Sequence, residues 1–175
     1  MNIDLEKFKA AYEKWVEEFL EDFQAGNTQK AIKSYPLVTP ESVPWTPFKG
    51  DPSTMTFALA TSGGLYLKES QPPFDTESIH GDPSFREIPR TANLSDIRIA
   101  HAHYDHRLAE QDLNTIFPLE RFIELEQEGL IGKFADTHYS FSYVNDIAPL
   151  VTKSIPRVIR QLKTEGVNAL FLVPV

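Results

Sequence analysis

The spacing of the hydrophobic positions changes along the chain and predicts where helices and strands lie. Over residues 4–24, apolar and aromatic side chains recur every three or four residues with Glu and Lys between them, which predicts an amphipathic helix. Asp4 is a suitable N-cap for this helix and Gly26 a suitable stop. Because large aromatic side chains are usually buried, we expect the aromatic side to pack in a core or a subunit contact rather than to hold a ligand. That side consists of Leu5, Phe8, Tyr12, Trp15, Phe19 and Phe23.

Prolines recur through residues 36–52 and exclude a long helix or a central strand there. We interpret this segment as an extended strap over the surface, in which Trp45 and Phe48 are buried. The sequence therefore predicts an N-terminal helix with a proline-rich strap over residues 1–52, followed by an α/β domain over residues 53–175.

Short apolar runs replace the helical pattern from residue 55 onward and predict strands. The run at 55–61 is expected to form a buried strand that resumes after a glycine turn at 65–67, and residues 97–100 are expected to form another strand. Residues 68–91 have the composition of a loop. The last run, 166–175, is apolar at nearly every position, which is typical of a fully buried parallel strand.

Two helices are predicted between these strands. One begins at Pro118 and ends near residue 128, and the other covers residues 146–163 with a kink or a restart at Pro156. Residues 135–143 are too irregular to assign. The expected fold is α/β, a mainly parallel sheet flanked by helices in a Rossmann-like three-layer arrangement that is incomplete at the C-terminus.

Composition and charge exclude several classes of partner and of chemistry. With 17 basic and 25 acidic side chains the net charge is −8, which argues against a nucleic acid or an anionic membrane as partner and favours a small-molecule substrate or a protein. Because neither a secretory signal nor an apolar run long enough to span a membrane is present, a cytoplasmic location is expected. The chain has no cysteine, so these residues contain no disulfide, no Cys-ligated metal and no catalytic thiol.

A histidine-rich segment follows the strand predicted at 97–100. On an extended backbone His101 and His103 share one face, as acid–base partners or metal ligands must, and Asp105 adds a carboxylate. A metal site is disfavoured, because the His-x-His-x-x-His spacing is short and surface histidines at a strand end are often only polar loop residues. A role in a substrate site is favoured instead. Asp112 and Asn114 are expected to orient the histidines from behind and to contribute to substrate binding.

Gly63, Gly64 and Arg86 are the other candidates for substrate binding. The two glycines form either a tight turn or a backbone surface that a substrate can approach closely. Arg86 has the planar fork that clamps a carboxylate, but a salt bridge to Asp82 or Glu87 explains it equally well.

Seven segments, taken in order, resemble the selenoprotein B family of glycine, sarcosine and betaine reductases, which includes the related subunit of D-proline reductase. Each segment is weak alone, whereas their order and spacing are specific. They are residues 57–65 (FALATSGGL), 73–75 (PFD), 81–89 (GDPSFREIP), 101–105 (HAHYD), 112–118 (DLNTIFP), 129–132 (GLIG) and 166–175 (GVNALFLVPV).

The resemblance implies a reductase subunit that cleaves a C–N bond of glycine, betaine, sarcosine, D-proline or a similar compound. It further implies partner subunits, a dithiol or thioredoxin-type donor, and a redox-active selenocysteine or cysteine directly after the strand at 166–175. That residue is absent from these 175 residues, so we expect a chain truncated at a UGA codon and inactive in reduction. On this interpretation His101, His103 and Asp105 move protons to the leaving group.

Two other classes of function stay open. One is a non-catalytic binding or assembly paralogue, and the other is a metal-dependent enzyme that uses His101, His103 and Asp105. In each case the apolar residues at 166–175 favour self-association into a homo-oligomer, because an apolar strand in solvent seeks cover.

Overall fold

The computed structural model describes residues 4–38 and 46–175, which fall into two units, Met1–Phe48 and Lys49–Val175. The expected burial of Trp45 concerns a residue outside the described ranges. Phe48 is described and is 59% exposed, so the prediction that it is buried is wrong. Its neighbours on both sides are exposed as well, which leaves its ring no surface to pack against.

The N-terminal unit is a pair of helices, α1 (Leu5–Gln24) and α2 (Thr28–Lys33). The predicted start of α1 is confirmed, since the Asp4 side chain accepts a hydrogen bond from the Lys7 amide. Trp15 is buried, and its ring N–H donates to the carbonyl oxygen of Ala31 in α2. Phe8, Tyr12 and Trp15 of the aromatic side therefore pack as core, as expected, whereas Phe23 at the end of α1 is 55% exposed.

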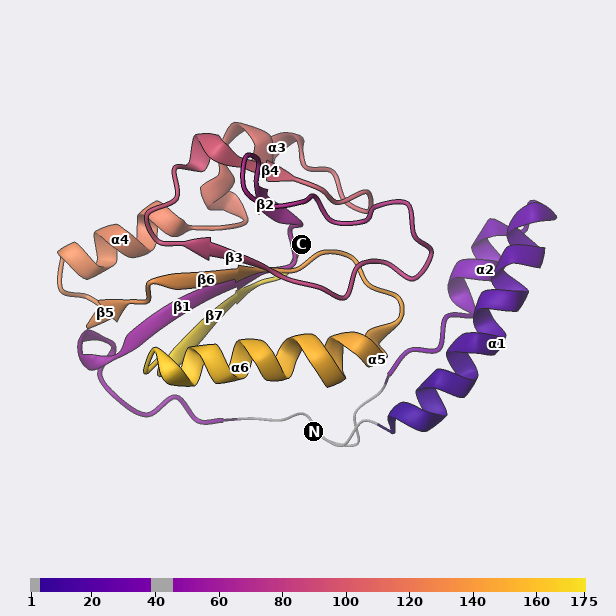
Figure 1. Cartoon of the computed structure of the whole chain (residues 1–175), viewed down its shortest axis with the longest axis horizontal. Helices are drawn as coiled ribbons and strands as arrows, with labels where there is room; N and C mark the ends of the chain where they lie inside the picture. The colour runs from indigo at the N-terminus through magenta and orange to yellow at the C-terminus, as the bar shows by residue number, and fades with distance from the viewer. Residues whose placement is uncertain (1–3, 39–45) are drawn as a thin grey trace. The chain divides into compact units, whose positions relative to one another are not determined.

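The second unit contains a sheet in which β3 pairs with β6, and β6 and β5 pair with the end and the start of β1 on one side, while β7 pairs with β1 on the other side (Figure 1). Strands β5, β6 and β7 run parallel to β1, and β3 is antiparallel to β6. The predicted mainly parallel α/β sheet is thus confirmed. The strands are β1 (Thr56–Thr61), β3 (Arg86–Pro89), β5 (Lys133–Phe134), β6 (Thr137–Ser140) and β7 (Ala169–Val173).

Helices cover both faces of this sheet. Helix α6 (Ile155–Thr164) lies on one face, where Val158 packs against Ala60 of β1 and Tyr139 of β6. It follows α5 (Ile147–Pro149) and a π-helical turn (Leu150–Ser154), so the long predicted helix is divided before its proline at position 156.

The opposite face carries α4 (Leu119–Gln127) and the larger apolar core, in which the rings of Phe122 and Phe134 stack. Above it lie α3 (Arg107–Gln111) and a separate two-stranded antiparallel sheet, β2 (Leu65–Leu67) with β4 (Ile97–Ile99) (Figure 1). Short 3₁₀ turns at Pro52–Thr54, Leu94–Asp96 and Leu113–Thr115 complete the elements.

Three predictions about strands need correction. Residues 86–89, expected to be loop, form β3, because Ile88 is buried opposite His138 of β6. The strand expected at 97–100 forms, but it pairs with β2 outside the main sheet.

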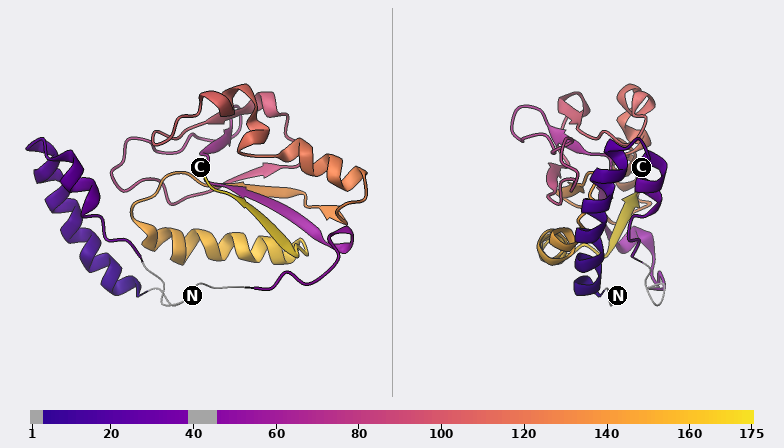
Figure 2. Two further views of the ribbon diagram at one scale, coloured as in Figure 1. Left: turned by 180° about the vertical axis from the view of Figure 1, so that it is seen from behind. Right: turned by 90° about the vertical axis from the view of Figure 1, so that its right-hand side faces the viewer.

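The last strand is the third correction, because it is not fully buried. β7 pairs only with β1 among the described strands, and Figure 2 shows it on the outer side of β1 in the view from behind. Leu170, Phe171 and Leu172 are 38%, 47% and 66% exposed. Successive strand residues face opposite sides of a sheet, so β7 lacks full cover on both faces.

Within the described ranges, none of the helices is long and apolar enough to cross a membrane.

Candidate functional site

The carboxyl ends of β1, β6 and β7 meet at one edge of the sheet. Thr61, the last residue of β1, is in register with Ser140 of β6 on one side and with Val173 of β7 on the other. The backbone N–H of Val175 then donates to the hydroxyl oxygen of Ser62 at 3.0 Å. In open α/β sheets this edge is where ligands bind, so the turn after β1 lies at the centre of the candidate site.

Gly63 and Gly64 form that turn, and close packing requires a glycine at position 64. Gly64 has a φ of +69°, and a Cβ there would lie 2.4 Å from the carbonyl oxygen of Ala100. The Gly63 amide donates to Thr61 Oγ1 and the Gly64 amide to the Phe141 carbonyl. Both N–H groups are therefore occupied, and neither is available for a substrate carboxylate in this arrangement.

His101 is fixed beside this turn by Ala100, whose amide donates to the Gly64 carbonyl at 2.8 Å. The His101 ring is buried, and its Nδ1 accepts a hydrogen bond from the His103 amide at 3.1 Å. Burial, and then the nearby imidazoles of His103 and His106, lower the pKa of His101. At neutral pH the ring is thus uncharged with its proton on Nε2, which makes it a hydrogen-bond donor.

The structure brings His101 and His103 together, with ring centroids 6.0 Å apart. A bend at residues 102–104 causes this, however, and not the extended backbone that was expected. His103 is exposed, and its ring lies 3.7 Å from the ring of Tyr143. Its ring nitrogens make no hydrogen bond to any described residue, so they can exchange protons with a ligand or with solvent.

Two tyrosines that the sequence analysis did not select complete this cluster. The Tyr104 hydroxyl donates to the Gly63 carbonyl at 3.2 Å, and its ring meets the His101 ring edge-on at 4.8 Å. Burial raises the pKa of Tyr104 to about 12, so it stays protonated and keeps this bond. Tyr104 was detectable as a neighbour of the histidines, but Tyr143 lies in a segment whose pattern gave no element.

Asp105 pairs with the Arg107 guanidinium in solvent. Asp112 accepts the Asn114 amide as the cap of a 3₁₀ turn, and the Asn114 side chain donates to Glu120 at the start of α4. None of these side chains touches His101 or His103 within the part of the chain that the structure describes. Their contacts are those of loop and helix capping.

Arg86 has structural partners for most of its donors. Its guanidinium makes four hydrogen bonds and lies over the Phe74 ring at 4.1 Å. The ion pair with Asp82 that the sequence offered as the alternative is present at 3.6 Å. The hydrogen-bond acceptors are the carbonyl oxygens of Pro72, Pro73 and Phe85 and the hydroxyl of Ser84.

A metal site at His101, His103 and Asp105 has no support in this geometry. Over residues 4–38 and 46–175, no group of three or more His, Cys, Asp or Glu side chains is placed so that it could hold a metal ion. The carboxylate of the proposed set, Asp105, is instead paired with Arg107 in solvent.

This architecture defines the class of protein: an α/β domain with a mainly parallel sheet covered by helices on both faces. The chain belongs to the family described as glycine/sarcosine/betaine reductase selenoprotein B, which matches residues 9–174. The resemblance drawn from the sequence segments is thereby confirmed.

Three curated relatives place the chain within this family. It is 34% identical over 139 residues to D-proline reductase subunit gamma of Acetoanaerobium sticklandii, covering 79% of this chain and 55% of that protein. It is 30% identical over 139 residues to glycine reductase complex component B subunit gamma of Carboxydothermus hydrogenoformans, covering 78% and 32%. Sarcosine reductase complex component B subunit beta of Peptoclostridium acidaminophilum is 29% identical over 112 residues, covering 63% and 26%.

The matched part therefore spans about half of the first relative and less of the other two. No solved structure matches the chain.

Proposed function

We propose that this chain is the substrate-side part of a reductase subunit that cleaves a C–N bond in a small amino-acid-like compound such as glycine, sarcosine, betaine or D-proline. The names of the relatives support the reaction class. Partner subunits and a dithiol donor belong to the same proposal, because those relatives are named as subunits or components of complexes.

The observation that carries the proposal is the meeting of β1 and β7 at the candidate site. The Val175 amide is bonded to Ser62, and Gly63 is bonded to Tyr104, which packs on His101. A selenocysteine or cysteine next to Val175 would lie beside this turn, exposed at a strand end whose position the sheet fixes. Such a residue would supply a nucleophilic selenolate or thiolate that displaces the amine and forms a bond from selenium or sulfur to carbon. A thiolate of the dithiol donor then attacks that selenium or sulfur, and the carbon leaves with the bonding electrons and takes up a proton. The second thiol closes the donor to a disulfide and releases the selenolate or thiolate.

His101 and His103 take different roles in this proposal. The His101 ring can donate a hydrogen bond from Nε2 to a substrate, but it cannot accept a proton at Nδ1 without breaking its bond to the His103 amide. His103, which is exposed and has its ring tilted against that of Tyr143, gives the departing amine its proton. We further propose that Arg86, Asp105, Asp112 and Asn114 hold the surrounding loops, as their contacts indicate.

Reading the gene beyond the codon for Val175 tests the proposal first. A UGA codon followed by an open frame with cysteine codons supports it. If the frame closes at once, the reductase proposal fails for this chain, and a non-catalytic binding or assembly paralogue takes its place.

Turnover of the complete subunit then tests the histidine. Because a positioned acid–base group contributes typically about 100-fold or more, His103→Gln should lower the rate by at least that factor. His106→Gln is the matched control, since His106 lies on the same loop and is paired with Glu110. Equal rates for wild type and His103→Gln would remove His103 from the mechanism.

A further inference from the structure

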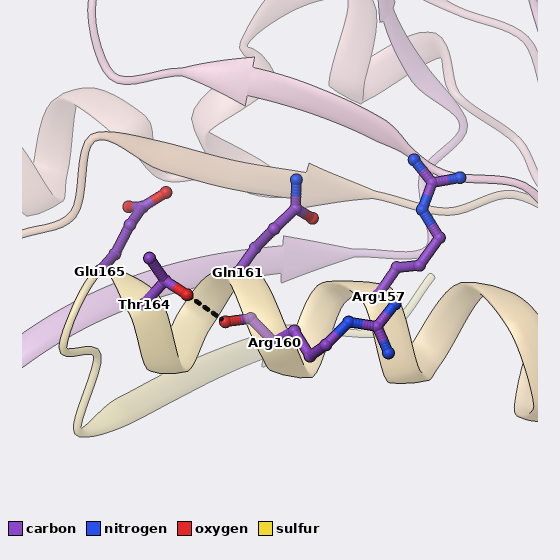
Figure 3. Close-up of a pocket in the computed structure, with 5 residues that line it drawn as sticks. All are labelled: Arg157, Arg160, Gln161, Thr164 and Glu165. Atoms are coloured by element: carbon purple, nitrogen blue, oxygen red, sulfur yellow. Dashed lines mark hydrogen bonds between the residues drawn. The ribbon is translucent and has the colours of Figure 1, made fainter.

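A polar hollow lies between α6, β3 and the loop before β3. Its volume is about 280 Å³, and an adjoining hollow of about 290 Å³ continues along α6. Figure 3 shows Arg157, Gln161 and Glu165 projecting from α6 towards the strands, whereas Arg160 lies along the helix. Arg157 lines both hollows. The first is further lined by Gln71, Ser84, Phe85, Arg86, Glu87 and Ser154.

Arg157 is the available cation of this hollow. Its guanidinium lies 5.2 Å from the centre of the Phe85 ring, a cation–π contact that holds the side chain in place. It makes no hydrogen bond or ion pair with any residue that the structure describes. Arg86, in contrast, already makes four hydrogen bonds and an ion pair. A carboxylate entering this hollow would therefore be bound by Arg157 and not by Arg86.

Glu87 supplies a carboxylate in the same hollow. The Gln161 side chain donates to Glu87 Oε1 at 2.7 Å and fixes its orientation. Within the described ranges Glu87 forms no ion pair, so its charge is not matched by Arg157 or Arg86. The amide of Gln71 spends one N–H on the Glu87 carbonyl and keeps a second for a ligand.

We propose that this hollow binds a small zwitterion of the α-amino-acid type, with its carboxylate on Arg157 and its ammonium group on Glu87. One unpaired cation and one unpaired anion in one concave site fit a ligand that carries both charges. Known ligand pockets measure about 300–1,000 Å³, so this hollow is suited to a ligand of few atoms.

The site is separate from the candidate active site. It lies at the β3 edge of the sheet, whereas β7 forms the opposite edge, with β6 and β1 between them. A ligand bound here would not be the one that reacts beside β7. The inference concerns an accessory site and does not depend on the reductase proposal.

Calorimetric titration of the 175-residue chain with glycine, at low ionic strength and pH 7, tests this site. Because the pocket is open and the ligand small, we expect a dissociation constant on the order of 1 mM. Acetate and methylammonium, which each carry half of the charge pair, should bind at least about tenfold more weakly, since each loses one charge-assisted contact. The proposal is overturned if glycine gives no saturable binding, or if acetate binds as tightly as glycine.

Matched variants locate the binding. Arg157→Met and Glu87→Gln should each weaken glycine binding about tenfold or more, and the new amide oxygen of Glu87→Gln still accepts from Gln161. Arg160→Met, on the same helix but lining only the adjoining hollow, should change it less than about twofold. An equal loss in Arg160→Met would show that general charge, and not this pocket, binds the ligand. Amide spectra of each variant verify the fold.

Discussion

Lowering the pH from 7 to 5 should destabilise the α/β unit through His138. This side chain has no exposed surface, and its ring stacks on Phe134 at 4.0 Å. Its Nδ1 accepts the Leu59 amide at 3.2 Å, while Nε2 is buried without a partner among the described residues. Burial, and to a smaller extent Arg90, lowers the pKa of His138 to about 3.

Stability falls as the pH is lowered, because the unfolded chain binds the proton at a higher pH than the folded chain does. The unfolded chain takes up a proton near the ordinary pKa of 6.5, whereas folded His138 stays neutral down to about pH 3. Stability is therefore fully present above pH 6.5 and is lost as the pH falls towards 3. The whole difference is worth about 5 kcal/mol, of which about 2 kcal/mol is lost between pH 7 and pH 5.

His138→Asn isolates this contribution. The Asn oxygen can take the place of Nδ1 and accept the Leu59 amide, but it does not titrate. Urea unfolding of wild type and variant, followed by circular dichroism at pH 7, 6 and 5, gives the two free energies of unfolding. The advantage of wild type should shrink by about 2 kcal/mol from pH 7 to pH 5. A difference that stays constant within about 0.5 kcal/mol would refute the argument, because other titrating groups cancel in the comparison.

Two further changes test the turn after β1 and the open strand. Gly64→Ala should lower the free energy of unfolding by more than about 2 kcal/mol in thermal unfolding, because the methyl group meets the Ala100 carbonyl and φ is positive. Gly26→Ala is the control, since Gly26 also has a positive φ but no atom lies within 4 Å of the added methyl group. It should cost less than about 1.5 kcal/mol. Leu172→Lys should weaken self-association in sedimentation velocity, since a charge on an exposed edge strand opposes pairing, and a wild-type chain that stays monomeric at all concentrations would contradict the proposed association.

The spacing of apolar residues predicted those elements that carry a clear apolar face or an apolar run within their own sequence. The bounds of α1 and α4 agree closely with the prediction, because amphipathic spacing and caps are local signals. The strand β3 was missed since it is short, and only Ile88 in it is both apolar and buried. Its stability comes from pairing with β6, a partner far along the chain that no local pattern reveals.

In the candidate site, too, the sequence predicted local features but not the contacts that depend on distant residues. The histidine spacing correctly suggested that His101 and His103 lie together, but the turn that joins them depends on one backbone hydrogen bond to a ring nitrogen. Tyr143, which contacts His103, follows β6, a strand that the sequence pattern did not predict, and Asp105 is paired with Arg107, so residue types alone could not give these contacts.

The exposure of β7 is the feature of the fold that composition alone could least predict. An unbroken apolar run is expected both of a central strand and of an edge strand that another segment covers, and composition cannot distinguish them. Among the described strands this run pairs on one side only, and Leu170, Phe171 and Leu172 are partly exposed on alternating faces. No charged residue interrupts residues 169–175, although charges are a usual protection of natural edge strands. This exposed apolar surface lies beside the turn that carries the candidate site, so a segment or second chain that paired with β7 would also help to shape that site.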